Sequence, residues 1–252
     1  MKRLIVNADD LGYSGGVDAG ILRAHRDGIV TSASFMTNQP DGERTAALVR
    51  GAPRLDVGVH LVITSGSPLS DPARVPSLVR ANGTFRRPGD ILGKGIVDAE
   101  DVLREYRAQF ARARQLLGRD PTHIDAHHWV EEEPAVLDAF VTLARETGAA
   151  VRSLDGRIRD RVRAAGVRTP DAYSREFQHA GRIDVASLIR ILDGLGDGVT
   201  EIGCHPGEPD PDLERRSSYA KERPIELATL TDPRVRAAIA DRGIELTTFA
   251  AL

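Results

Sequence analysis

Four short apolar runs, each followed by residues that can bind a metal or transfer a proton, constrain the fold of this chain most strongly. They are Leu4-Ile5-Val6 before Asn7-Ala8-Asp9-Asp10, Val57-Gly58-Val59 before His60, Thr122-His123-Ile124-Asp125 before His127-His128, and Thr200-Glu201-Ile202-Gly203 before Cys204-His205-Pro206-Gly207. Short apolar runs are typical of buried strands. In parallel β/α barrels and open parallel sheets, active-site residues gather at the carboxyl ends of the strands. The sequence therefore predicts one of these two architectures, with a site built from several strand ends.

The length and charge of the chain are those of an ordinary α/β enzyme. Its 252 residues approach the typical length of a (β/α)8 barrel, so we expect a single domain with one large core. The formal net charge is -3, with both signs mixed along the chain. Because such a chain presents no field of one sign, we expect neither nucleic acid nor an anionic membrane as its partner.

The cysteine count and the N-terminus indicate a reducing compartment. Cys204 is the only cysteine, so no intramolecular disulfide can form. The apolar stretch after Met1 is too short for a signal peptide, and no run approaches the roughly 18 apolar residues of a membrane span. We therefore expect a cytoplasmic protein without a membrane span.

Strands and helices are predicted to alternate along the chain. Strands are expected near residues 32–36, 56–59, 122–126, 149–152, 199–203 and 244–246, and helices over 15–27, 41–51, 98–117, from 134 onwards, 184–195 and 232–242. A Pro/Gly/Ser-rich stretch at 65–95 is too long for a simple connection. It is either a lid on the substrate side or a surface insertion, and residues 206–222 are expected to form a second polar loop.

Asp9 and Asp10 are adjacent carboxylates at the end of the first strand. Side chains of neighbouring residues in a strand point to opposite faces, but at the transition from strand to loop both can turn into one cavity. There they would suit one metal ligand and one base. The alternative is an ordinary turn, which Asp favours and which Gly12 would complete.

Histidines supply the other candidate ligands. His60 lies in an apolar segment, where an imidazole needs a partner and can serve either structure or metal binding. Alternation along a strand places His123, Asp125 and His127 on one face and His128 on the other. We favour His127, at the strand end, as the ligand, with His123 behind it; a helix would instead make both of them ligands.

His205 closes the fourth run and should face the same cavity, where it can act as an acid or base. Its neighbour Cys204 could be a nucleophile. The apolar residues before Cys204 instead favour an inert, buried thiol.

Together these segments resemble the YdjC-like carbohydrate deacetylases, a family that includes chitooligosaccharide deacetylase. The resemblance is carried, in order, by Leu4-Ile5-Val6-Asn7-Ala8-Asp9-Asp10-Leu11-Gly12, Asp27-Gly28-Ile29-Val30-Thr31-Ser32, Gly58-Val59-His60, Thr122-His123-Ile124-Asp125-Ala126-His127-His128 and Cys204-His205-Pro206-Gly207. These motifs extend over most of the chain, so residues 1–252 are identified as a single deacetylase domain.

The resemblance implies a distorted (β/α) barrel of the glycoside hydrolase/deacetylase type that hydrolyses the N-acetyl group of an amino sugar or oligosaccharide. Carried onto this sequence, it makes Asp10, His60 and His127 the ligands of one divalent metal ion, Asp9 the base and His205 the acid. The family implies magnesium, whereas two imidazoles and a carboxylate also suit zinc, cobalt or nickel. The candidate partners are an N-acetylated sugar and a second copy of the chain in a homodimer.

Four further residues are candidates for places around the metal or against the substrate: His123, Asp125, His128 and Trp129. Family members often have a longer histidine run where this chain has Trp129-Val130-Glu131, and Phe in place of Leu11. Trp129 offers either a face for stacking on a sugar or a packing group at the rim of the core.

Other functions compatible with these residues are a metal-dependent phosphoesterase or amidohydrolase, a deacetylase of a glycolipid, and a sugar- or metal-binding regulator without turnover. A phosphoesterase would need a second metal and more carboxylates. Retention of Asp9 and His205 argues against the regulator.

Overall fold

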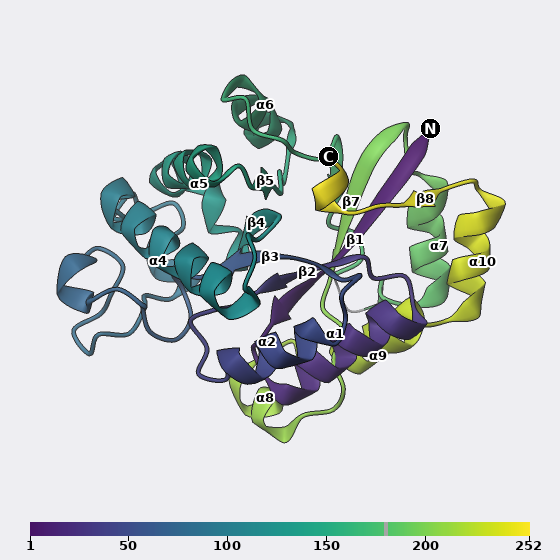
Figure 1. Cartoon of the computed structure of the whole chain (residues 1–252), viewed down its shortest axis with the longest axis horizontal. Coiled ribbons are helices and arrows are strands. Elements are labelled where there is room, and N and C mark those ends of the chain that lie inside the picture. Colours follow the sequence, from purple (N-terminus) through teal and green to yellow (C-terminus); the bar gives the residue numbers. More distant parts are fainter. Residues whose placement is uncertain (179–180) are drawn as a thin grey trace.

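A computed structural model describes residues 1–178 and 181–252, and it contains one parallel sheet surrounded by helices (Figure 1). The strands are β1 Lys2–Leu11, β2 Ser32–Phe35, β3 Asp56–Leu61, β4 His123–Ala126, β5 Ala150–Val151, β6 Ala172–Ser174, β7 Gly198–Cys204 and β8 Glu245–Leu246. Their order in the sheet is β5-β4-β3-β2-β1-β7-β6, and β8 pairs with β1. Because β5 and β6 form the ends of this order, the curled sheet is a distorted, open (β/α) barrel, as predicted.

The helices lie around the outside of the sheet. They are α1 Gly15–Asp27, α2 Gly42–Arg50, α3 Pro88–Ile91, α4 Ala99–Leu117, α5 Pro134–Thr147, α6 Gly156–Ala164, α7 Val185–Asp193, α8 Pro211–Arg216, α9 Arg223–Leu230 and α10 Pro233–Asp241, with 3-10 turns η1 Pro72–Arg74, η2 His127–Glu132 and η3 Phe249–Ala251. Helices α4 and α5 pack together on one flank, and α7 and α10 on the other (Figure 1). Among the described residues, no helix combines the length and the apolar character needed to cross a membrane.

Local sequence signals set the helix ends. The Ser14 side chain accepts a hydrogen bond from the backbone N–H of Val17 at the start of α1, and Asp98 caps α4 in the same way. Helix α4 ends at Gly118, whose φ of 68° is a left-handed conformation that glycine adopts without steric cost. These ends agree with the predicted helices 15–27 and 98–117.

Alternation along β1 separates an outer core from the barrel interior. Leu4, Val6 and Ala8 pack into the apolar cluster beneath the helices, whereas Ile5 points the other way and meets Phe249 from η3. Asn7 and Asp9 share the parity of Ile5. The polar residues of the site therefore begin on the inner face of the central strand.

The sequence prediction missed several elements. Helix α6, strand β6 and helix α9 were not predicted, and the expected polar loop 206–222 contains helix α8. The 65–95 stretch also holds η1 and α3. Its side chains Val75, Leu78, Phe85 and Ile91 are buried in the same apolar cluster as residues of α4, so much of this stretch packs against that helix.

Candidate functional site

A β-bulge brings both adjacent carboxylates of β1 to the site. The register between β1 and β2 shifts between Ala8 and Leu11, and Asp10 has a φ of 69°. This left-handed conformation is costly for a residue other than glycine, and it turns the Asp10 side chain out of strict alternation. Asp9 and Asp10 consequently border one pocket, as expected, but from within the strand and not from a strand-to-loop transition.

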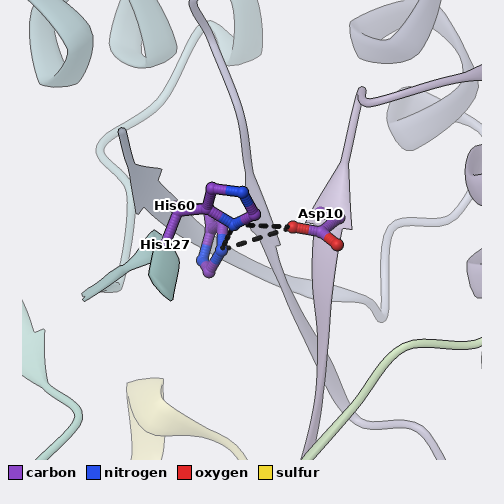
Figure 2. Close-up of side chains that lie close together, drawn as sticks. All are labelled: Asp10, His60 and His127. Atoms are coloured by element: carbon purple, nitrogen blue, oxygen red, sulfur yellow. Dashed lines mark hydrogen bonds and ion pairs between the residues drawn. The ribbon is translucent and has the colours of Figure 1, made fainter. Parts of the chain in front are cut away.

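Asp10, His60 and His127 converge from three places in the sheet (Figure 2). Asp10 Oδ1 lies 3.4 Å from His60 Nε2 and 3.3 Å from His127 Nδ1, and the two nitrogens are 3.1 Å apart. Asp10 Oδ1 is buried without a hydrogen-bonding partner among the described residues. This oxygen therefore has a free position for a cation or a water molecule.

These three donor atoms fit a divalent metal ion. Donors bound at about 2.0–2.2 Å to one ion stand roughly 3.0–3.4 Å apart, which matches the separations found here. Two imidazole nitrogens and one carboxylate oxygen are also a ligand set used by catalytic metals. The residues therefore suit one ion with room for further ligands.

Asp125 orients His60 from behind. His60 Nδ1 lies 2.8 Å from Asp125 Oδ1, an arrangement that leaves Nε2 free to bind an ion. Burial alone would lower the pKa of His60, but three neighbouring carboxylates, that of Asp125 foremost, outweigh it and raise the pKa to about 9. The excess of negative charge around His60 favours a cation at this position.

A tight turn after β4 positions His127 and its neighbours. The strand ends at Ala126, so alternation does not continue to His128, which has a φ of 64°, and Trp129, which has a φ of 55°. The prediction that His128 points to the opposite face is wrong: its ring lies 3.7 Å from that of His127, and both border the pocket. The left-handed backbone turns the His128 side chain toward the pocket and not to the opposite face.

His123 lies deeper in the barrel than the three converging side chains. Its Nε2 is 3.1 Å from Asn7 Oδ1, and its ring stacks on Phe249 at 3.9 Å. Asn7 in turn donates hydrogen bonds to Asp9 Oδ1 and Asp125 Oδ2. His123 thus lies behind the three converging side chains and is connected to them through Asn7.

Arg152 holds Asp9 in its ionised form. Its guanidinium is fully buried and donates to both carboxylate oxygens of Asp9 at 2.7 Å, while its Nε donates to Glu201. Burial would raise the pKa of Asp9, but Arg152 outweighs this effect and holds the pKa below its usual value. Asp9 is therefore a carboxylate whose orientation is fixed.

His205 faces Asp9 across the pocket. Its Nε2 lies 3.9 Å from Asp9 Oδ2, and burial lowers the pKa of His205 to about 4. The backbone N–H of His205 donates to Glu226 of α9 at 2.5 Å, and the Tyr219 hydroxyl donates to the same carboxylate at 2.6 Å. The neutral imidazole is thus held beside the carboxylate of Asp9.

Arg223, Arg152 and Glu226 are site residues that the sequence analysis did not single out. Arg223, the first residue of α9, donates to Asp10 Oδ2 at 2.5 Å. Arg152 directly follows β5, so the rule that strand ends carry the site would have flagged it. No comparable signal marks Arg223 and Glu226, because they start an unpredicted helix.

One pocket of about 400 Å³ is lined by Asp9, Asp10, His60, His127, His205 and Arg223, whereas Arg152 and Glu226 lie behind its wall. Its wall also includes Pro88 from the 65–95 stretch and Ser217, Ser218 and Tyr219 from the 206–222 segment. Both long connections therefore reach the substrate side.

Cys204 is fully buried, its thiol donates to the Asn7 carbonyl, and burial raises its pKa, which agrees with an inert thiol.

Comparisons with known proteins find similar chains over almost the whole length of this one. A family model described as YdjC-like protein matches residues 3–241. A carbohydrate deacetylase of Geobacillus stearothermophilus is 42% identical over 97% of this chain and 96% of its own length. A chitooligosaccharide deacetylase of Enterobacter sp. (strain 638) is 36% identical over 98% of each chain. The crystal structure of an Enterococcus faecalis V583 protein, named for a proposed role in cellobiose-phosphate cleavage, superimposes with a TM-score of 0.92 at 34% identity, over 99% of this chain and 98% of that one.

Proposed function

This chain belongs to the YdjC-like family, and we propose that it hydrolyses the N-acetyl group of an amino sugar or oligosaccharide at a divalent metal centre. The enzyme class, a carbohydrate deacetylase, follows from relatives of that name that align over almost the whole chain. The convergence of Asp10, His60 and His127 beside Asp9 and His205 is the observation that carries the proposed mechanism.

The proposed ligands are Asp10 Oδ1, His60 Nε2 and His127 Nδ1. When bound there, a divalent ion would polarise the acetamide carbonyl and increase the acidity of water beside it. Asp125 would keep His60 in the tautomer that presents Nε2, and Arg223 would hold the other oxygen of Asp10.

Asp9 and His205 would move a single proton. Hydrolysis adds hydroxide to the acetyl carbon and breaks the C–N bond, so one proton must leave water and one must reach the departing nitrogen. Asp9, kept ionised by Arg152, accepts the first. His205 is neutral at rest and lies 3.9 Å from Asp9, so it is placed to pass this proton to the nitrogen. The products are a free amine and acetic acid, which loses its proton to become acetate.

A second metal, which a phosphoesterase would need, has little support. Asp9, His60 and Asp125 form another group of candidate ligands. Both carboxylates of that group already make ion pairs with Arg152, and His60 belongs to the first group as well. A guanidinium thus occupies the place where a second cation would be needed.

The proposal is tested by measuring acetate released from diacetylchitobiose and a panel of small N-acetyl sugars. Metal-stripped enzyme would receive magnesium, zinc, cobalt or nickel, beside Asp9→Asn and the exposed control Asp120→Asn. We expect metal-dependent release that falls at least about 100-fold in Asp9→Asn and is unchanged in the control. Cleavage of a phosphoester or simple amide without acetate release from any sugar would refute the proposal.

A further inference from the structure

We propose that the indole of Trp129 is a stacking platform for a pyranose ring of the substrate, and that Arg175 and Glu132 hold this indole in place. The inference rests on the proposed function and specifies its substrate class. Trp129 borders the same pocket as Asp10 and His205 and is partly exposed. A large aromatic ring without full cover in a pocket wall is a common means of binding an organic ligand.

The backbone at Trp129 is strained. His128 and Trp129 have φ/ψ angles of 64°/24° and 55°/32°, both in the left-handed region. This conformation is uncommon for residues other than glycine, and it costs a bulky side chain such as that of Trp129 about 1–2 kcal/mol. Strain of this kind persists mainly where the resulting geometry is used. Here the turn carries His127 to the metal ligands and places Trp129 in the pocket wall.

A charged pair fixes one face of the indole. The guanidinium of Arg175 lies 4.7 Å from the ring centroid of Trp129, and Arg175 makes an ion pair with Glu132 at 3.2 Å. A cation over the face of tryptophan is attracted to its π electrons, so Arg175 restricts rotation of the ring. The pre-ordered indole would therefore lose little conformational freedom when a ligand binds.

The chemistry of a flat indole selects a class of substrate. A pyranose ring whose hydroxyl and acetamido groups are all equatorial has a face made of C–H groups, which can pack on an aromatic ring while its polar edge remains free to bind polar groups. Glucosamine-type sugars have such a face, whereas a simple acyclic amide has no ring and therefore lacks it. We therefore expect preference for N-acetylglucosamine-type units over simple amides.

The chain itself supplies a reporter for this contact, because Trp129 is its only tryptophan. Tryptophan emission of metal-loaded Asp9→Asn protein would be titrated with diacetylchitobiose, which this variant should not consume. N-methylacetamide, which has the amide but no sugar ring, is the matched control ligand. We expect a saturable change in emission with the sugar and none with the amide. Constant emission at saturating sugar would overturn the inference.

Kinetics of Trp129→Leu and Trp129→Phe in otherwise wild-type protein give the second measurement. Loss of the ring in Trp129→Leu should raise KM for diacetylchitobiose about tenfold and change kcat less, whereas Trp129→Phe should retain most of the affinity. A KM within twofold of wild type in Trp129→Leu would also overturn the inference. If wild-type protein releases no acetate from any sugar, the proposed function fails. The emission titration alone then tests whether a sugar stacks on Trp129.

Discussion

The buried carboxyl groups of this protein differ in whether a positively charged side chain lies beside them. Asp9 has Arg152 and Asp10 has Arg223, so both carboxylates remain ionised despite full burial. Glu131 is fully buried too, but neither of its carboxylate oxygens has a hydrogen-bonding partner among the described residues. Burial raises the pKa of Glu131 to about 8. Glu131 is therefore a neutral acid at pH 7. Because the folded chain keeps this proton to a higher pH than the unfolded chain does, the stability of the protein depends on pH.

Glu131→Gln should stabilise the protein increasingly as pH rises. In the unfolded chain Glu131 loses its proton near pH 4.5, whereas in the folded chain the pKa is about 8. A raised folded pKa means that stability is fully present below the lower value and is lost as pH rises to the higher one. We expect the gain in the free energy of unfolding, measured with urea, to be about 2–3 kcal/mol larger at pH 8 than at pH 5. An equal gain at both pH values would contradict this explanation.

At the scale of elements, the first turn of α9 connects two parts of the site. Arg223 and Glu226 are three residues apart and so lie on one face of the helix. Arg223 binds the carboxylate of Asp10, and Glu226 accepts hydrogen bonds from the His205 backbone and the Tyr219 hydroxyl. The Arg223 Nε also donates to the Tyr219 carbonyl. The start of α9 thereby positions a proposed metal ligand, the proposed acid and one wall of the pocket.

Glu226→Gln should lower kcat about tenfold with a smaller change in KM, because the amide has one acceptor oxygen for two donors and His205 would shift. Tyr219→Phe removes only one donor and keeps the ring beside His205, so its kcat should fall less. Steady-state kinetics on diacetylchitobiose would measure both. A larger loss in Tyr219→Phe than in Glu226→Gln would show that Tyr219 acts independently of Glu226.

At the scale of the molecule, the proposed metal ligands join segments that are distant in the chain. Asp10 belongs to β1, His60 to β3 and His127 to the turn after β4, and only β2 separates these strands in the order of the sheet. An ion bound to all three would favour the folded state, since the unfolded chain does not hold these donors together.

Metal binding should therefore raise the thermal midpoint of the stripped protein. At a metal concentration of 100 Kd the gain is about 2.7 kcal/mol, which corresponds to about 5–10 °C for a chain of this length. Differential scanning calorimetry would detect this shift with the preferred ion. His60→Gln should abolish it, whereas His25→Gln, on α1 away from the pocket, should keep it. A shift that survives in His60→Gln would place the ion elsewhere.

Long periodic segments and strand ends were predictable from the sequence, because each depends on local information. Helix α4 carries a clear apolar period with an Asp cap and a Gly stop, and Asp9, Asp10, His60, His127 and His205 all follow apolar runs. Strand β6 has only three residues, none of them fully buried, and α6 buries only Ile158 and Val162, so neither leaves a strong pattern. Such short elements form because packing against the neighbouring strands and helices stabilises them.

The sequence by itself determined the alternating α/β class and which side chains approach the carboxyl ends of the strands, because these follow from hydrophobic periodicity and chain direction. Tertiary structure alone decided the direction of individual side chains and their partners. The bulge at Asp10 and the left-handed turn at His128 and Trp129 override simple alternation. Arg152 reaches Asp9 across 143 positions and Arg223 reaches Asp10 across 213. Such charge pairs exist only because folding brings the partners together, so that their attraction offsets the cost of removing both from water.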